Sequence, residues 1–168
     1  MKSTIRPATP RDIEAIYDIS CRVHLSPLYR AFIPGSRYED FKQRFTHNVS
    51  YFSKTYSPRI RQRLTDPSWF YWVAEVDGVV RGFTLAHKTE GELELKGLFV
   101  EEAFQGQGIG KQLFEVSCSI REPGERISLE VISKNDRAIG MYKRLGFHRV
   151  NSTPEPFFGA PMLCMQKH

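Results

Sequence analysis

Val100-Glu101-Glu102-Ala103-Phe104-Gln105-Gly106-Gln107-Gly108-Ile109-Gly110-Lys111 is the stretch that decides the fold. An apolar segment ends at Val100, glycines follow, and the apolar spacing of a helix begins over 108–119. Glycine allows the backbone to approach a ligand closely, and the free N–H groups at a helix N-terminus bind anions, phosphates above all. The stretch therefore predicts a phosphate-binding turn between a strand and a helix.

Two common phosphate motifs do not match this turn. A P-loop ending at Gly110-Lys111 needs glycine where Gln105 stands and serine or threonine where Gln112 stands. A dinucleotide fingerprint needs G-x-G-x-x-G within a βαβ unit, whereas the glycines here are spaced G-x-G-x-G and follow a predicted antiparallel meander. What fits is Q-x-x-G-x-G over 105–110.

The segments around the turn predict one α+β domain over residues 3–168, with a mixed sheet. Alternating or β-branched runs predict strands over 4–8, 69–76, 79–86, 92–100, 127–132, 147–150 and 162–165. Asp77-Gly78 and Glu90-Gly91 predict the turns of a three-stranded meander. Capping patterns predict helices that open at Thr9, at a Ser36–Glu39 capping box and at Ser57-Pro58, and further helices over 108–119 and 135–145, with chain breaks at Pro27 and Pro34-Gly35.

Composition excludes several classes of protein. A chain of 168 residues with 40% hydrophobic and 12% aromatic residues is neither disordered nor of low complexity. The longest apolar run, 69–74, is far short of the roughly 20 residues that a membrane helix needs. The N-terminus has no apolar signal region, and the three cysteines show no C-x-x-C pair. We therefore expect a cytoplasmic domain with no membrane contact and no metal.

The formal net charge of +5 is concentrated in one segment. Residues 36–63 hold seven cations, namely Arg37, Lys42, Arg44, Lys54, Arg59, Arg61 and Arg63, against Glu39 and Asp40. Such a run is either a solvated helical face or a patch that attracts an anionic substrate, a cofactor phosphate or nucleic acid. No helix-turn-helix, zinc-finger or RNP pattern accompanies it, so the sequence does not favour nucleic acid.

A second segment supports a family resemblance. Asn135–Phe147 fits N-x-x-A-x-x-x-Y-x-x-x-G-F, and together with Q-x-x-G-x-G and the order of elements it resembles the GNAT superfamily of N-acetyltransferases. The resemblance implies a mostly antiparallel, twisted sheet of six to seven strands flanked by about four helices. It also implies direct attack of an amine on acetyl-CoA in a ternary complex, with no metal.

The resemblance assigns the cofactor-binding residues. Backbone N–H groups over Gln105, Gly106, Gln107, Gly108, Ile109, Gly110 and Lys111 would hold the pyrophosphate, and the Gln105 side chain can add a hydrogen bond. Leu98, Phe99 and Val100 would pair with the pantetheine arm, and the Val100 amide would donate to the thioester carbonyl. Asn135 would bind the cofactor arm or cap its helix, a role for which asparagine is well suited.

The catalytic assignments leave alternatives open. Tyr142 matches the family tyrosine that protonates the thiolate leaving group, but it also shares an apolar stripe with Ile139 and Leu145 and would serve as a core residue. Glu94 alternates with Glu92 and Lys96 if no bulge intervenes, and it stands where histone-type members carry their base. A water chain, or a solvent-facing Glu94, is the alternative, and Glu130 is a weaker candidate.

The acceptor amine is not identified by any motif. A small molecule, a peptide or a protein could supply it, and the basic segment over 36–63 predicts an acidic group near the amine. A non-catalytic acyl-CoA-binding module and a transferase for another acyl-CoA are the competing functions. Many members dimerise through their C-terminal strands, so a homodimer is open. The histidines at 24, 47, 87 and 148 show no metal spacing and are expected to be structural or exposed.

Overall fold

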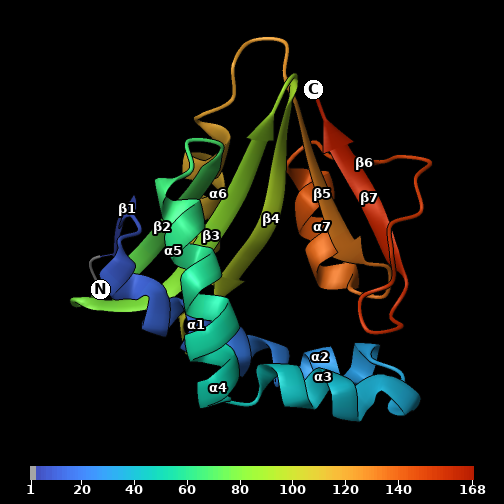
Figure 1. Cartoon of the computed structure of the whole chain (residues 1–168). Coiled ribbons are helices and arrows are strands. Elements are labelled where there is room, and N and C mark those ends of the chain that lie inside the picture. Colours follow the sequence, from blue (N-terminus) through green and yellow to red (C-terminus); the bar gives the residue numbers. More distant parts are fainter. Residues whose placement is uncertain (1–2) are drawn as a thin grey trace.

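The computed structural model describes residues 3–168 and is built on a sheet in the order β1-β2-β3-β4-β5-β7-β6 (Figure 1). Every neighbouring pair is antiparallel except β4 and β5, which run parallel. The strands are β1 (Ser3–Pro7), β2 (Trp69–Val76), β3 (Val79–Thr89), β4 (Glu92–Val100), β5 (Arg126–Ile132), β6 (His148–Arg149) and β7 (Met162–Lys167). This is the mixed, mostly antiparallel sheet that the sequence predicts.

Helices cover both faces of the sheet (Figure 1). One face carries α1 (Ile13–His24) and α5 (Ser57–Thr65), whose isoleucines pack on β2 and β3, and the other carries α6 (Ile109–Cys118) and α7 (Asp136–Arg144). The remaining helical segments are η1 (Pro10–Asp12), α2 (Pro27–Phe32), η2 (Gly35–Arg37), α3 (Tyr38–Phe45), α4 (Val49–Tyr51), the π-helical η3 (Phe52–Tyr56) and η4 (Glu102–Phe104). The sheet is thus buried between two helical layers, with α2 and α3 below one end of it in Figure 1.

The two central parallel strands separate part-way along their length. β5 pairs with β4 only over Glu92–Leu95, and the strands then diverge (Figure 1). Pairing of β4 with β3 is irregular at the same place, because Leu95 and Gly97 oppose consecutive residues of β3 and Lys96 bulges out. The Thr84 hydroxyl on β3 donates to the Gly97 carbonyl at 2.9 Å and holds this bulge. One edge of β4 is therefore left without a partner strand from the bulge to Val100.

Local signals in the sequence are confirmed where they depend on few residues. The Thr9 amide donates to the Asp12 carboxylate at 2.7 Å, the bond that an acidic N3 residue makes back to the N-cap in a capping box. Asp77 and Gly78 have φ of 51° and 80°, the positive pair that a two-residue type I′ hairpin needs.

One predicted helix cap is wrong. Ser36 lies inside the short turn η2, and α3 begins after Arg37 with no side-chain cap. α5 begins at Ser57 with Pro58 in its first turn, as predicted, but helical backbone already starts after Asn48, whose side chain accepts from the Tyr51 amide, and runs through α4 and η3 into α5. Proline has no N–H to donate within a helix, and the wider π turn just before Pro58 is where a helix accommodates that loss. Pro27 likewise opens α2 rather than only breaking the chain.

Candidate functional site

The glycine turn presents unpaired amides at the start of α6. Gly106 and Gly108 have φ of 78° and 84°, a backbone region that residues other than glycine rarely adopt. Gly108 is the N-cap of the helix. The first amides of an α-helix have no partner within it, so those that follow Gly108 are free to bind an anion. Gly110 does not have a positive φ, and a Cβ atom there would only contact the Val100 side chain at 3.9 Å.

Side chains in the turn fold back onto the protein. The Gln105 amide donates to the Val100 carbonyl at 2.9 Å, and the Gln107 amide donates to the Ala103 carbonyl at 3.1 Å. Lys111 lies 3.7 Å from Glu115 on the exposed side of α6. Gln105 therefore ties the turn to the end of β4, and the second hydrogen of its side-chain NH2 group is left to donate elsewhere.

The Val100 amide faces the open edge of β4. The backbone amide of Glu101 points toward β3, where it donates to the Arg81 carbonyl at 2.9 Å. Because successive amides of a strand point to opposite edges, those of Val100 and Leu98 point away from β3, where no strand pairs with them. These two amides can donate to an extended chain that lies along this edge as an added strand would. The side chain of Phe99 points to the α1 face of the sheet, against Phe83.

Tyr142 on α7 lies at the edge of the core. Its ring packs edge-to-face on Phe147 at 5.7 Å. Burial raises the pKa of Tyr142, and Tyr29 on α2 and Cys118 raise it further, so the hydroxyl keeps its proton at neutral pH. A tyrosine that donates a proton must have a protonated hydroxyl, but a tyrosine that only packs in the core also has one, so the pKa does not decide between the two roles. Tyr29 belongs to the same group of residues, but no pattern in the sequence brings α2 close to α7.

The remaining predicted site residues make local contacts. Asn135 caps α7, with its Oδ1 accepting from the Ala138 amide at 3.2 Å. Glu94 lies on the same face as Lys96, before the bulge, and its carboxylate pairs with the Lys96 ammonium. Glu130 is exposed on β5. Neither glutamate lines the cavity described next, whereas Lys96 does.

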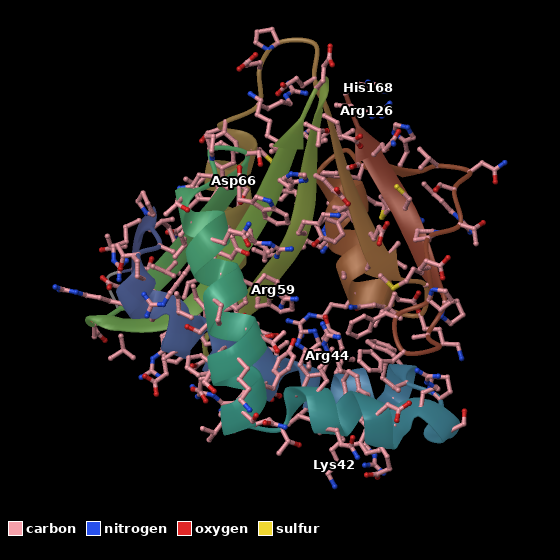
Figure 2. The ribbon with its side chains drawn as sticks, viewed as in Figure 1. Lys42, Arg44, Arg59, Asp66, Arg126 and His168 are labelled. Carbon is pink, nitrogen blue, oxygen red and sulfur yellow. The ribbon has the colours of Figure 1, made fainter. Side chains whose placement is uncertain are left out.

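A cavity of about 240 Å³ lies between α1, α3, α5 and strands β2 to β4. Aromatic rings form most of its wall. Its lining holds no carboxylate but four cations, namely Arg44, Arg59, Arg63 and Lys96. Figure 2 shows Arg44 and Arg59 pointing from α3 and α5 toward the same space, while Lys42 on α3 points away from it. The basic segment is thus divided. Arg59 and Arg63 are half-buried against the cavity, and Arg44 lines it although its side chain is largely exposed. The other cations are exposed and do not line it, namely Arg37, Lys42, Lys54 and Arg61.

The inward cations are only partly satisfied. Arg63 stacks on Trp69 at 3.7 Å and donates to the Tyr71 hydroxyl at 3.4 Å. The Nε atom of Arg59 is buried and has no hydrogen-bond partner among the residues that the structure describes. Burial raises the pKa of both Tyr56 and Tyr71, so these wall phenols stay neutral. The positive charge of the lining therefore suits an anionic ligand.

His24 is the site residue that sequence reasoning missed. It ends α1, is 7% exposed and lines the cavity. Its Nδ1 atom lies 2.7 Å from the Ser20 carbonyl, and its ring stacks on Phe45 at 4.0 Å. Burial lowers its pKa to about 4. The spacing of Ile13, Tyr17, Ser20 and His24 on one helix face is the signal that could have placed it inside.

Within residues 3–168 no group of three or more His, Cys, Asp or Glu side chains is arranged to hold a metal ion. The helices of that same range include none that is long and apolar enough to span a membrane.

Comparison with known proteins points to one family. Residues 35–147 match the model of the acetyltransferase (GNAT) family. The chain is 31% identical over 119 residues to the peptidyl-lysine N-acetyltransferase YjaB of Salmonella typhimurium, covering 69% of this chain and 76% of that one. It is 25% identical over 121 residues to a putative [ribosomal protein bS18]-alanine N-acetyltransferase of Bacillus subtilis, covering 70% and 80%.

Coverage of the relatives differs. The chain spans only 23% of the length of the uncharacterized protein ML0378 of Mycobacterium leprae, to which it is 32% identical over 85 residues. Among solved structures, the PaiA N-acetyltransferase of Thermoplasma acidophilum, determined in complex with coenzyme A, aligns with a TM-score of 0.77 over 99% of both chains at 17% identity. That likeness shows the fold.

Proposed function

Because the chain belongs to the acetyltransferase (GNAT) family, we propose that it transfers the acetyl group of acetyl-CoA to a primary amine whose molecule also carries an acidic group. The acceptor is a small molecule or the end of a peptide. The observation that carries this choice is the cavity beside β4, whose lining holds four cations and no carboxylate.

The donor half of the site fits acetyl-CoA. The free amides after Gly108, at the positive end of the α6 dipole, would hold the pyrophosphate. The open edge of β4 over Leu98–Val100 would hold the pantetheine arm, and the Val100 amide would polarise the thioester carbonyl. Tyr142 would give its proton to the departing thiolate. Asn135, through the amide group left over from capping, would be the remaining cofactor contact.

The acceptor half selects by charge. Arg44 and Arg59 would bind a carboxylate or phosphate, and the aromatic walls would hold the apolar part of the acceptor. Two unit charges 4 Å apart near a protein surface interact by about 4 kcal/mol. A polyamine or aminoglycoside would meet that interaction as repulsion, so these amines should be poor acceptors.

The test is free-thiol release from acetyl-CoA with matched amines. An amino acid and its carboxamide differ by one negative charge at nearly constant shape, and a diamine of similar length supplies the opposite charge. We expect kcat/KM for the amino acid to exceed that for the carboxamide by about tenfold or more, with a smaller ratio at high salt. A diamine as the best acceptor would contradict the charge assignment.

The same assay addresses the competing functions. Acetyl-CoA binding with no thiol release on any amine would indicate a binding module, and faster release from a longer acyl-CoA would identify a different donor. A homodimer and a cytoplasmic location stay predictions, and sedimentation of the purified chain tests the first.

A further inference from the structure

The hydrogen bond to Ser20 determines which nitrogen of His24 is free. A carbonyl oxygen only accepts, so the Nδ1 atom at 2.7 Å must carry the hydrogen. In the neutral imidazole the lone pair then lies on Nε2. No residue in the part of the chain that the structure describes donates to Nε2, and the side chain lines the cavity. His24 therefore offers the cavity a proton acceptor.

Aromatic rings from α2, α3, β4 and the segment between β6 and β7 hold this imidazole in place. Phe45 on α3 stacks on it with an interplanar angle of 7°, while Tyr29 on α2 lies 4.9 Å away, Phe99 on β4 5.2 Å and Phe157 5.8 Å between ring centroids. A ring packed on several sides has little freedom to turn. The direction of Nε2 is thus fixed by packing before any ligand arrives.

Charged groups around the imidazole keep it neutral. Arg44 on α3 lowers the pKa of His24, in addition to the larger effect of burial. Arg59 on α5 and Lys96 on β4 are the other cations of the cavity, and Tyr29 is the nearest phenol. The cavity lining contains no carboxylate that would stabilise an imidazolium. His24 is therefore uncharged at neutral pH, with its one ring hydrogen on Nδ1 and the Nε2 lone pair available to an N–H donor.

The position of His24 relates it to the reacting end of β4. Phe99, whose ring contacts His24, is the residue before Val100. Tyr29 contacts His24 on one side and influences the pKa of Tyr142 on the other. An amine that enters from the cavity toward the Val100 amide would thus pass between His24 and Tyr142.

We infer that His24 is the general base of the transfer, binding the attacking amine and accepting its proton at Nε2. This inference rests on the proposed function. The amine nitrogen forms a bond to the carbonyl carbon as the carbon–sulfur bond of the thioester breaks. The nitrogen loses one proton to Nε2, the thiolate gains one from the Tyr142 hydroxyl, and solvent carries the proton of His24 back to Tyr142. Glu94, the base that the sequence favours, is instead engaged by Lys96.

Two substitutions separate this role from a structural one. His24→Asn can place an amide nitrogen near the position of Nδ1 and keep the bond to Ser20, but it has no atom at Nε2. His24→Gln keeps a polar atom near Nε2 that cannot take a proton. We expect kcat to fall by about 100-fold or more in both. The melting temperature and the acetyl-CoA Kd of His24→Asn should stay near the wild-type values. His148→Gln, an exposed histidine on β6, should keep wild-type kcat.

Nitrogen NMR of the wild-type imidazoles is a readout independent of turnover and of any variant. At pH 7 His24 should show a protonated Nδ1 and an unprotonated Nε2, and Nε2 should shift when the best acceptor is added with coenzyme A. An Nε2-protonated tautomer or an imidazolium at pH 7 would overturn the inference. So would a folded His24→Asn protein with wild-type kcat. A wild-type protein that releases no thiol with any amine would instead refute the proposed function.

Discussion

Replacing Arg59 by glutamine should raise KM for an acidic acceptor while leaving the acetyl-CoA Kd unchanged. Arg59 points from α5 into the cavity, and its buried Nε has no partner among the described residues, so an acidic group on the acceptor would be that missing partner. A hydrogen bond to a charged group contributes about 1.5–3 kcal/mol, which corresponds to about 10- to 150-fold in binding. Because glutamine still donates one hydrogen bond, we expect the lower part of that range.

The assay measures initial rates of thiol release for the acidic acceptor and for its neutral carboxamide. Arg61→Gln is the matched control, since Arg61 lies on the same helix and loses the same charge but is exposed. On α3 the corresponding pair is Arg44→Gln in the cavity and Lys42→Gln, which points away (Figure 2). Measurements at low and high salt separate a direct contact from a distant charge, because salt screens exposed charges more strongly.

Two results would refute the reasoning. An equal rise in KM for Arg59→Gln and Arg61→Gln would mean that the acceptor responds only to the overall positive field. An equal rise for the acid and the carboxamide would mean that Arg59 shapes the cavity without meeting the acidic group. In either case the inward cations would lose their role in selecting the acceptor.

Three further predictions concern the donor side and the stability of the fold. Gly108→Asp should abolish acetyl-CoA binding in a folded protein, because it places a negative charge at the proposed pyrophosphate site. Gly108→Asn is the control for the backbone, because asparagine tolerates positive φ as well as aspartate does. Calorimetry that gives the same acetyl-CoA Kd for the wild type and Gly108→Asp would reject the site. Tyr142→Phe should lower kcat by about 100-fold or more with little change in acetyl-CoA Kd, whereas a wild-type rate where chemistry limits turnover would leave Tyr142 as a core residue. Asp12→Asn should destabilise the protein by about 2 kcal/mol at pH 7, because Arg6 lowers the pKa of buried Asp12 to about 2 from an ordinary 3.8. That stabilisation is complete above about pH 4 and is lost as the pH falls through about 2, so urea melts of the two proteins should converge in acid, and a difference that persists at pH 2 would contradict it.

The features that the sequence predicts well depend on neighbouring residues. The hairpin at Asp77-Gly78 needs two residues that tolerate positive φ, and the glycine turn needs the same at Gly106 and Gly108. The N-cap at Asn135 depends on an amide three residues away. Each of these structures is determined within a few residues of chain, so a short pattern is enough to predict it.

Features that depend on distant packing could not be predicted. The bulge at Lys96 is stabilised by Thr84 from a neighbouring strand, and it determines how far the open edge of β4 extends. The helical turns that precede α5, from Val49 to Tyr56, depend on how their aromatic residues pack on α1 around Tyr17. Nothing in the sequence indicates that Phe41 and Phe45 on α3 would lie against His24 at the end of α1.

The proposed pyrophosphate site and the proposed acceptor contacts are encoded differently in the chain. The pyrophosphate site would lie in a contiguous turn, where Gly106 and Gly108 adopt a positive φ that few other residues tolerate. Two of the cations proposed to select the acceptor lie on one face of α5, where Arg59 and Arg63 face the cavity beside the buried Ile60 and Arg61 faces solvent. Residues on that face can change charge without removing the Ile60 contact that anchors the helix. On these assignments, the charge of the acceptor site can change on this fold while the proposed acetyl-CoA site stays constant.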